Sequence, residues 1–168
     1  MKRIATLIAT VFFAASATGC DSNTYYFDKE QYVDKIEKIE LRYAKPGENV
    51  YIMDLEEGKP QFNLEHSSVK ETLDADKIPS FVDEFSTITF HLVYKCSNEP
   101  VGQILVMYLT NGNYIVSSLE ILNKKGYDCF CEFDSNCEFV KFFGKLADGD
   151  KYDTVLSNYF TSYTKVGI

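Results

Sequence analysis

The residues of this chain best suited to chemistry are its cysteines, which are Cys20, Cys96, Cys129, Cys131 and Cys137. The last three follow a C-x-C-x5-C pattern, and Cys96 is distant from them. Such thiols can form disulfides, stay free, hold zinc or act in redox exchange. Zinc sites usually show C-x2–4-C spacing, which this group lacks. A bridge between residues two apart on one strand would strain the backbone. We therefore predict structural disulfides and no metal, and the easiest bridge joins Cys137 to Cys129 or Cys131.

The two histidines, His66 and His91, give weaker indications of chemistry than the cysteines do. His66 lies in a polar turn beside two serines, which would suit a hydrolase, but no G-x-S-x-G nucleophile motif accompanies it. His91 alternates with apolar residues, which favours a partly exposed position on a strand. We assign no catalytic residue. The alternative is an exported hydrolase-type enzyme whose site assembles from scattered histidine and acidic side chains.

Acidic residues are abundant without forming a recognisable site. Asp148, Asp150 and Asp153 suggest calcium, but the glycine and glutamate that complete an EF-hand loop do not follow. Neither a phosphate-binding glycine loop nor a dinucleotide fingerprint is present. The sequence therefore predicts no cofactor.

The N-terminus has the pattern of an export signal. Lys2 and Arg3 precede an apolar stretch over residues 4–15. That stretch is shorter than the roughly 20 residues that a membrane-spanning helix needs, and it is typical of a secretory signal. Residues 15–17 (Ala-Ser-Ala) offer a site for ordinary cleavage and simple secretion.

Residues 17–20 (Ala-Thr-Gly-Cys) resemble the lipobox of bacterial lipoproteins, although Ala17 stands where leucine is commonest. The resemblance implies that Cys20 is lipidated and becomes the anchor to the outer face of a bacterial membrane. Lipidation would leave four cysteines, an even number that suits an oxidising compartment. We therefore expect a signal peptide over 1–19, a lipidated cysteine with a short tether over 20–28, and a single domain over 29–168. The resemblance is to small bacterial lipoproteins in general, and it implies no activity.

Composition supports a globular, acidic domain. The chain has 168 residues, of which 45% are hydrophobic, enough for one substantial core. Without Lys2 and Arg3 it carries 15 basic and 25 acidic residues, a net charge of −10. Because an acidic surface repels phosphate backbones, nucleic acid is excluded as a partner.

A hairpin over residues 102–121 organises the predicted fold. Two apolar runs flank Asn111-Gly112, the strongest short hairpin signal, which predicts a two-residue type I′ turn. In that register Tyr108 opposes Ile115 and Val106 opposes Ser117. One face would hold Ile104, Val106, Tyr108, Ile115 and Leu119, and the other Leu105, Met107, Leu109, Tyr114 and Val116. Since both faces are apolar, we place this hairpin at the centre of the sheet.

Periodicity predicts the remaining elements. Strands are expected over 39–43, 49–54, 61–73 (interrupted), 87–94 and 127–133. Helices are expected near 29–34, from Asp74 with a kink or delayed start at Pro79, from Ser135 to Leu146 behind a capping box, and after Asp150. The fold class is α+β: an antiparallel sheet of five or more strands with two or three helices packed on it.

These expectations favour a non-catalytic binding module. If helices cover one apolar face of the sheet, the other is left for a protein partner or a second copy of the chain. The alternative is that both faces are covered within the monomer.

Overall fold

The structure, a computed structural model, describes residues 24–45, 51–53, 60–91, 100–121, 129–146 and 148–165. Its elements in chain order are β1 (Thr24–Tyr26), α1 (Lys29–Tyr32), β2 (Ile36–Ala44), β3 (Tyr51–Met53), β4 (Pro60–Phe62), the 3-10 helix η1 (Leu64–His66), β5 (Ser67–Thr72), the 3-10 helix η2 (Ala75–Lys77), α2 (Ile78–Phe85), β6 (Thr89–His91), β7 (Pro100–Leu109), β8 (Tyr114–Ile121), β9 (Cys129–Phe133), β10 (Phe139–Leu146) and α3 (Gly149–Tyr159). The predicted α+β class is confirmed.

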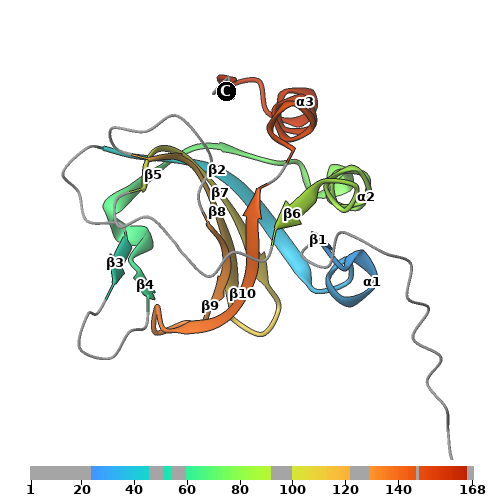
Figure 1. Cartoon of the computed structure of the whole chain (residues 1–168). Coiled ribbons are helices and arrows are strands. Elements are labelled where there is room, and N and C mark those ends of the chain that lie inside the picture. Colours follow the sequence, from blue (N-terminus) through green and yellow to red (C-terminus); the bar gives the residue numbers. More distant parts are fainter. Residues whose placement is uncertain are drawn as a thin grey trace, which may run out of the picture.

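One large antiparallel sheet dominates the fold (Figure 1). Among the described residues it has eight strands in the order β1-β6-β10-β9-β8-β7-β2-β5, and β3 and β4 form a separate pair. The β7–β8 hairpin lies inside the sheet, as predicted, with β9 on one side and β2 on the other.

The register of that hairpin differs from the prediction by one residue. Tyr108 pairs with Tyr114 and Met107 with Ile115. The loop therefore has three residues, and Gly112 adopts a φ of +87° while Asn111 does not enter the positive-φ region. This is the type I turn with a glycine bulge, which Asn-Gly serves as well as the tighter type I′ turn. Because side chains alternate along a strand, the shift exchanges the faces of β8 relative to β7.

The helices cover one face of the sheet. Figure 1 shows α1, α2 and α3 along one side of it, and their apolar residues form a helix-side core with Leu105, Met107 and Ile115. The rings of Phe130 and Phe90 stack at 5.0 Å within this core. The helix-side core supplies most of the buried apolar surface of the domain.

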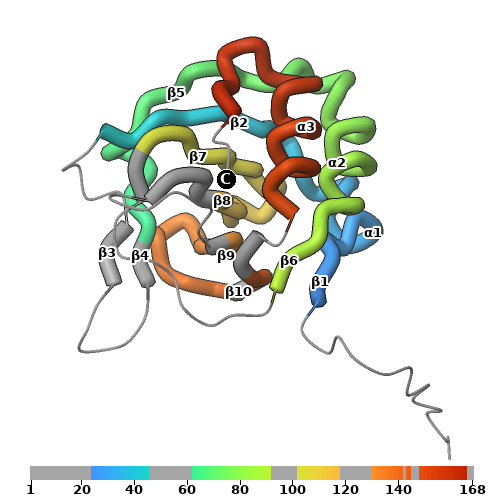
Figure 2. The backbone as a smooth tube through the Cα atoms, turned by 45° about the horizontal axis from the view of Figure 1, so that its top comes forward, coloured from blue at the N-terminus to red at the C-terminus, as the bar shows by residue number. Residues whose placement is uncertain are grey.

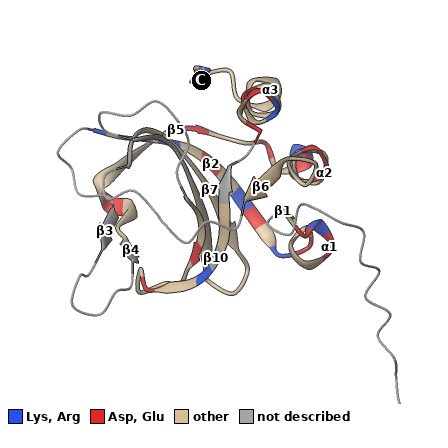
Figure 3. Cartoon of the chain, viewed as in Figure 1, with Lys and Arg blue, Asp and Glu red and all other residues tan. Residues whose placement is uncertain are grey.

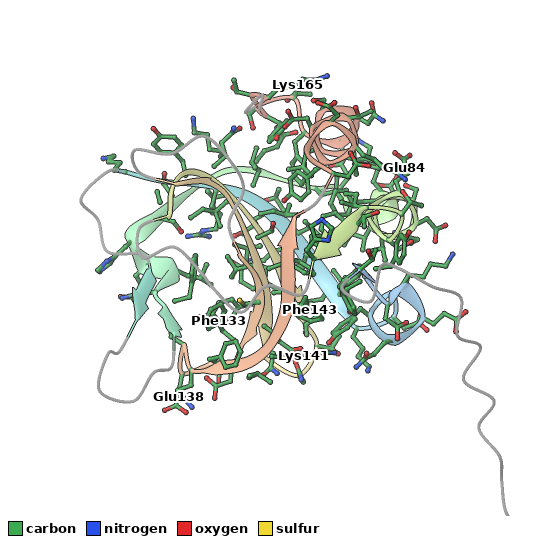
Figure 4. All side chains as sticks on the ribbon, in the orientation of Figure 1. Glu84, Phe133, Glu138, Lys141, Phe143 and Lys165 are labelled. Carbon is green, nitrogen blue, oxygen red and sulfur yellow. The ribbon has the colours of Figure 1, made fainter. Side chains whose placement is uncertain are left out.

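The opposite face of the sheet is also buried. Its residues form a second cluster, the β4-side core, composed of Ala44, Phe62, Ile104, Val106, Tyr114, Val116, Cys131 and Phe133. Phe62 of β4 covers these strands from outside the sheet and lies 5.6 Å from Phe133, ring to ring. Figure 4 labels Phe133 on β9 and Phe143 on the adjacent strand β10, whose side chains belong to the two different cores. The described part of this face is therefore occupied within the monomer, and docking of a partner or a second copy through a sheet face stays a prediction.

Aspartate side chains cap two of the helices, and the start of α1 was predicted correctly. The Asp28 side chain accepts a hydrogen bond from the Gln31 backbone N–H at 3.1 Å, and Asp148 caps α3 in the same way. Pro79 falls in the first turn of α2, which begins four residues after Asp74. Proline fits there because the first helical turn has no internal partner for its missing N–H.

The predicted helix over 135–146 is wrong, because residues 139–146 form strand β10. Two register shifts against β9 move the phenylalanines out of simple alternation, so Phe139 packs on the β4-side core and Phe143 on the helix-side core. A bulged strand can thus imitate the spacing of a helical stripe. The residues of the expected capping box form the β9–β10 turn.

The predicted tether over 20–28 is partly wrong. Thr24–Tyr26 forms strand β1, which pairs with β6, and Phe27 is buried with 2% of its surface exposed. The domain therefore begins at or before Thr24 instead of at residue 29. In the described residues, no helix has the length and apolar character to cross a membrane.

Adjacent residues of β7 test whether both faces are buried in the monomer. Ile104 lies in the β4-side core and Leu105 in the helix-side core, and neither is exposed. We expect Ile104→Ala and Leu105→Ala each to lower the free energy of unfolding by about 2–5 kcal/mol, measured by urea denaturation. A loss confined to Leu105→Ala would mean that the β4-side core is open in solution.

Candidate functional site

A recess described by the structure lies at the β4 end of the sheet. It has a volume of about 500 Å³ and is lined by Asn63, Leu64, Glu65, Tyr114, Ser135, Asn136 and Cys137. We call it the η1 pocket. One wall is the segment that leads into η1, the other is the β9–β10 turn, and Tyr114 of β8 lies between them.

Hydrogen bonds to the sheet hold the η1 wall in place. Arg42 on β2 donates from its guanidinium to the backbone oxygens of Leu64 at 3.2 Å and Ser67 at 2.8 Å. The Ser67 hydroxyl accepts a third bond from Arg42 at 2.8 Å and donates to the same Leu64 oxygen. These bonds hold η1 at both of its ends, so the Arg42 side chain positions this wall of the pocket.

Glu40 neutralises Arg42 inside the fold. The two side chains form an ion pair with an Nη1–Oε2 distance of 2.6 Å, and their exposed fractions are 12% and 7%. The Tyr108 hydroxyl donates to the same carboxylate at 2.7 Å, and Lys38 pairs with its other oxygen at 3.0 Å. Because every polar group in this network has a partner, the charges can remain in the interior.

The network shifts the ionisation of its members. Burial would raise the pKa of Glu40, but the hydrogen bonds from Tyr108, Lys38 and Arg42 outweigh it and hold the pKa below its ordinary value. Burial, and next the hydrogen bond to Glu40, raise the pKa of Tyr108 to about 12. Glu40 is therefore ionised and Tyr108 neutral across the physiological range.

The β9–β10 turn forms the other wall and has the geometry of the β7–β8 loop. In each turn the residue before a three-residue loop donates its backbone N–H to the carbonyl of the residue after the loop: Leu109 to Asn113, and Asp134 to Glu138. The last loop residue of the first turn is Gly112, whereas that of the second is Cys137, with a φ of +66°. Among the described residues other than glycine, only Cys137 has a positive φ.

Cys137 holds this conformation because its neighbours fix the turn. The Asp134 carboxylate accepts from the backbone N–H groups of Asn136 at 2.8 Å and Glu138 at 3.0 Å. The Cys137 carbonyl accepts from the Phe62 N–H at 3.4 Å, which links this turn to β4. Strained residues of this kind cost about 1–3 kcal/mol and are concentrated at functional sites. Here the strained backbone presents a partly exposed thiol to the pocket.

Tyr114 provides the aromatic part of the lining. Its hydroxyl donates to the Phe62 carbonyl at 2.8 Å, and its ring stacks on Phe133 at 5.8 Å. Burial, followed by the Cys137 side chain, raises the pKa of Tyr114 far above its ordinary range. Tyr114 is therefore a fixed, neutral group, suited to contact with a ligand rather than to proton transfer.

The side chains that line the η1 pocket carry several groups able to hydrogen-bond. They are two amides, two hydroxyls, a thiol and the Glu65 carboxylate. The pocket includes neither His66 nor His91: His66 is exposed at the end of η1 and His91 is exposed on β6. The structure does not bring the two histidines together: His66 directly precedes β5 at one edge of the strand order, and His91 lies on β6, next to the other edge. In the described residues, no three of the histidine, cysteine, aspartate and glutamate side chains are grouped to hold a metal ion.

The structure describes the side chains of two of the five cysteines, Cys131 and Cys137, in different environments. Cys131 is buried in the β4-side core, and Cys137 lies in a turn instead of at a helix start. Both are thiols in this structure. Cys20, Cys96 and the side chain of Cys129 lie outside the described residues. The predicted disulfide, which includes the choice of Cys129 or Cys131 as the partner of Cys137, stays a prediction.

Sequence reasoning missed the η1 pocket. Its walls come from residues 63–65 and 135–137, which no spacing rule connects. The Asp134–Asn136 stretch contains a turn signal, but we interpreted it as a helix cap. No protein-family model, curated protein or solved structure matches this chain.

The Glu40–Arg42 pair makes stability depend on pH. Because the pKa of Glu40 is lower in the folded state, its contribution is complete above the ordinary carboxyl pKa and is lost as the pH falls through the lowered value. We expect Glu40→Gln to lower the free energy of unfolding at neutral pH by about 3–5 kcal/mol, since Arg42 loses its buried counter-ion. The acid loss should also become shallower than in the wild type, as measured by urea denaturation between neutral and acidic pH.

The control for this variant is Glu30→Gln, at an exposed glutamate on α1. It should leave both the stability and the acid profile close to those of the wild type. If Glu40→Gln behaved like this control, the ion pair would contribute nothing to the fold.

Proposed function

We propose that this protein is a non-catalytic binding module at the outer face of a bacterial membrane, anchored through lipid on Cys20, and that it binds its partner at the η1 pocket. One observation carries the choice of surface: the described strands bury their side chains on both faces of the sheet. A partner must then dock on loops or on the outer faces of the helices. The η1 pocket is a recess of the described part of the chain in which polar groups from separate segments converge.

The size and chemistry of the pocket favour a polar ligand group. Its volume of about 500 Å³ is within the usual range for ligand sites. Among the described residues, the side chains of Glu65, Ser135 and Asn136 make no hydrogen bond and are exposed, so they are available to a ligand. Glu65 and the overall negative charge disfavour anions. The expected ligand is a neutral or cationic polar group, such as a side chain that projects from a partner protein.

The anchor rests on the sequence. The lipobox-like residues 17–20 follow an apolar segment of signal-peptide length, and the choice of the η1 pocket does not depend on Cys20. The two parts of the proposal therefore need separate tests.

The pocket is tested by filling it. We expect Ser135→Trp to abolish capture of the partner from membrane extracts while the urea midpoint stays close to that of the wild type, because Ser135 is exposed in the turn. Ser80→Trp, at an exposed serine on α2, is the matched control and should bind normally. The bound partner should also slow alkylation of Cys137. Equal capture by both variants, with Cys137 alkylated at an unchanged rate, would contradict the assignment of the pocket.

The anchor is tested by cell fractionation. Cys20→Ala should move the protein from the membrane fraction to the soluble fraction or the medium, because the acyl chains supply its membrane affinity. If wild type and variant fractionate alike, Cys20 is not the anchor.

A further inference from the structure

We infer that the end of the domain formed by β1 and α1 rests on the lipid headgroups and that the η1 pocket faces away from the membrane. This inference rests on the proposed anchor at Cys20. Three features of the molecule support it: the length of chain after Cys20, the attachment of β1 to the fold and the surface chemistry around β1.

The chain between anchor and fold is very short. Thr24, the first residue of β1, is four residues after Cys20. At about 3.3–3.6 Å per residue, the two Cα atoms can be at most roughly 14 Å apart. That span is smaller than the domain, so the position of Thr24 decides which end of the molecule meets the bilayer.

β1 is firmly attached to the rest of the domain. Tyr25 pairs with Phe90 on β6, and its ring lies 6.0 Å from that of Phe143. The Phe27 ring stacks on Tyr32 of α1 at 5.1 Å and meets Phe130 edge-on at 5.6 Å. Because release of β1 would expose these buried rings, the anchor restrains the orientation of the whole domain.

The η1 pocket lies across the molecule from β1. Figures 1 and 2 are related by a rotation about the horizontal axis, and both place β1 and α1 at the right and β3, β4 and the start of β10 at the left. The pocket is built at that second end, from η1 and the β9–β10 turn. An anchor at the first end would thus present the pocket to the surroundings.

The surface near β1 suits a headgroup layer. Tyr26 is 56% exposed, and a tyrosine side chain favours the membrane interface because its ring is apolar and its hydroxyl is polar. Residues 24–38 contain three lysines and four carboxylates, a net charge of −1. Figure 3 shows these basic and acidic residues interspersed on α1 and the start of β2. The exposed Tyr26 ring is therefore the feature of this end that favours the headgroup layer.

The test uses the full-length protein, acylated in a bacterial host and reconstituted in nanodiscs that contain a gadolinium-chelating lipid. Mass spectrometry first establishes that Cys20 carries lipid. Paramagnetic broadening of the amide signals then reports proximity to the headgroups. We expect the signals of Tyr25 and Tyr26 to lose intensity, while those of Glu65 and Asn136 keep theirs.

Two variants separate orientation from general adhesion. A Gly/Ser insertion after Asn23 should restore the Tyr25 and Tyr26 signals, whereas the same peptide added after Ile168 should not. Tyr26→Ser should weaken the broadening around β1, and Val69→Ser, at a residue of 49% exposure on β5, should leave it unchanged.

Any other outcome contradicts the orientation, the anchor or both. Broadening of Glu65 and Asn136, or no broadening at either end of an acylated protein, would overturn the orientation but leave the anchor standing. Absence of lipid on Cys20 would overturn the anchor and the orientation with it.

Discussion

The buried ion pair of Glu40 and Arg42 is the constraint on which the β4-side core and the η1 pocket depend. A charged network between a sheet and its cover is costly unless each donor and acceptor is satisfied. Here the cost is met by Tyr108, Lys38, Ser67 and the backbone of η1. The same bonds place η1 beside the sheet and so complete the β4-side core. The η1 wall of the pocket is therefore positioned by the groups that satisfy the buried Arg42 guanidinium.

Much of the fold could be predicted from local sequence. Alternation located β2, a capping residue located α1, and a 3.6-residue apolar period located α2 and α3. The prediction failed where the same residues were compatible with two local conformations of similar energy. Asn111-Gly112 serves either a two- or a three-residue loop, and the pairing of β7 with its neighbours decides between them. Likewise, the phenylalanines of β10 match a helical stripe, and only the bulged pairing with β9 makes them a strand.

The candidate site could not be predicted for a different reason. Its two walls are far apart in sequence and are joined through Arg42, through the bond between Phe62 and Cys137, and through Tyr114. The sequence did mark Cys137 as chemically interesting, but as half of a disulfide in front of a helix. Cys137 occupies the position in its turn that Gly112 occupies in the β7–β8 turn. This equivalence is evident only from the three-dimensional structure of both loops. The proposed function follows from this arrangement: a core closed on both faces, a polar recess at one end, and an N-terminal strand at the other.

Hydrogen exchange in an Arg42→Met variant tests the central claim, that this guanidinium positions the pocket wall, most directly. The methionine keeps an apolar stem of similar length but removes the bonds to Leu64 and Ser67. The account predicts that the amides of His66 and Ser67, which bond within η1, lose protection, while those of the β7–β8 hairpin keep it. Unchanged protection at His66 and Ser67 would contradict the claim, because η1 would then hold its position without the charge network.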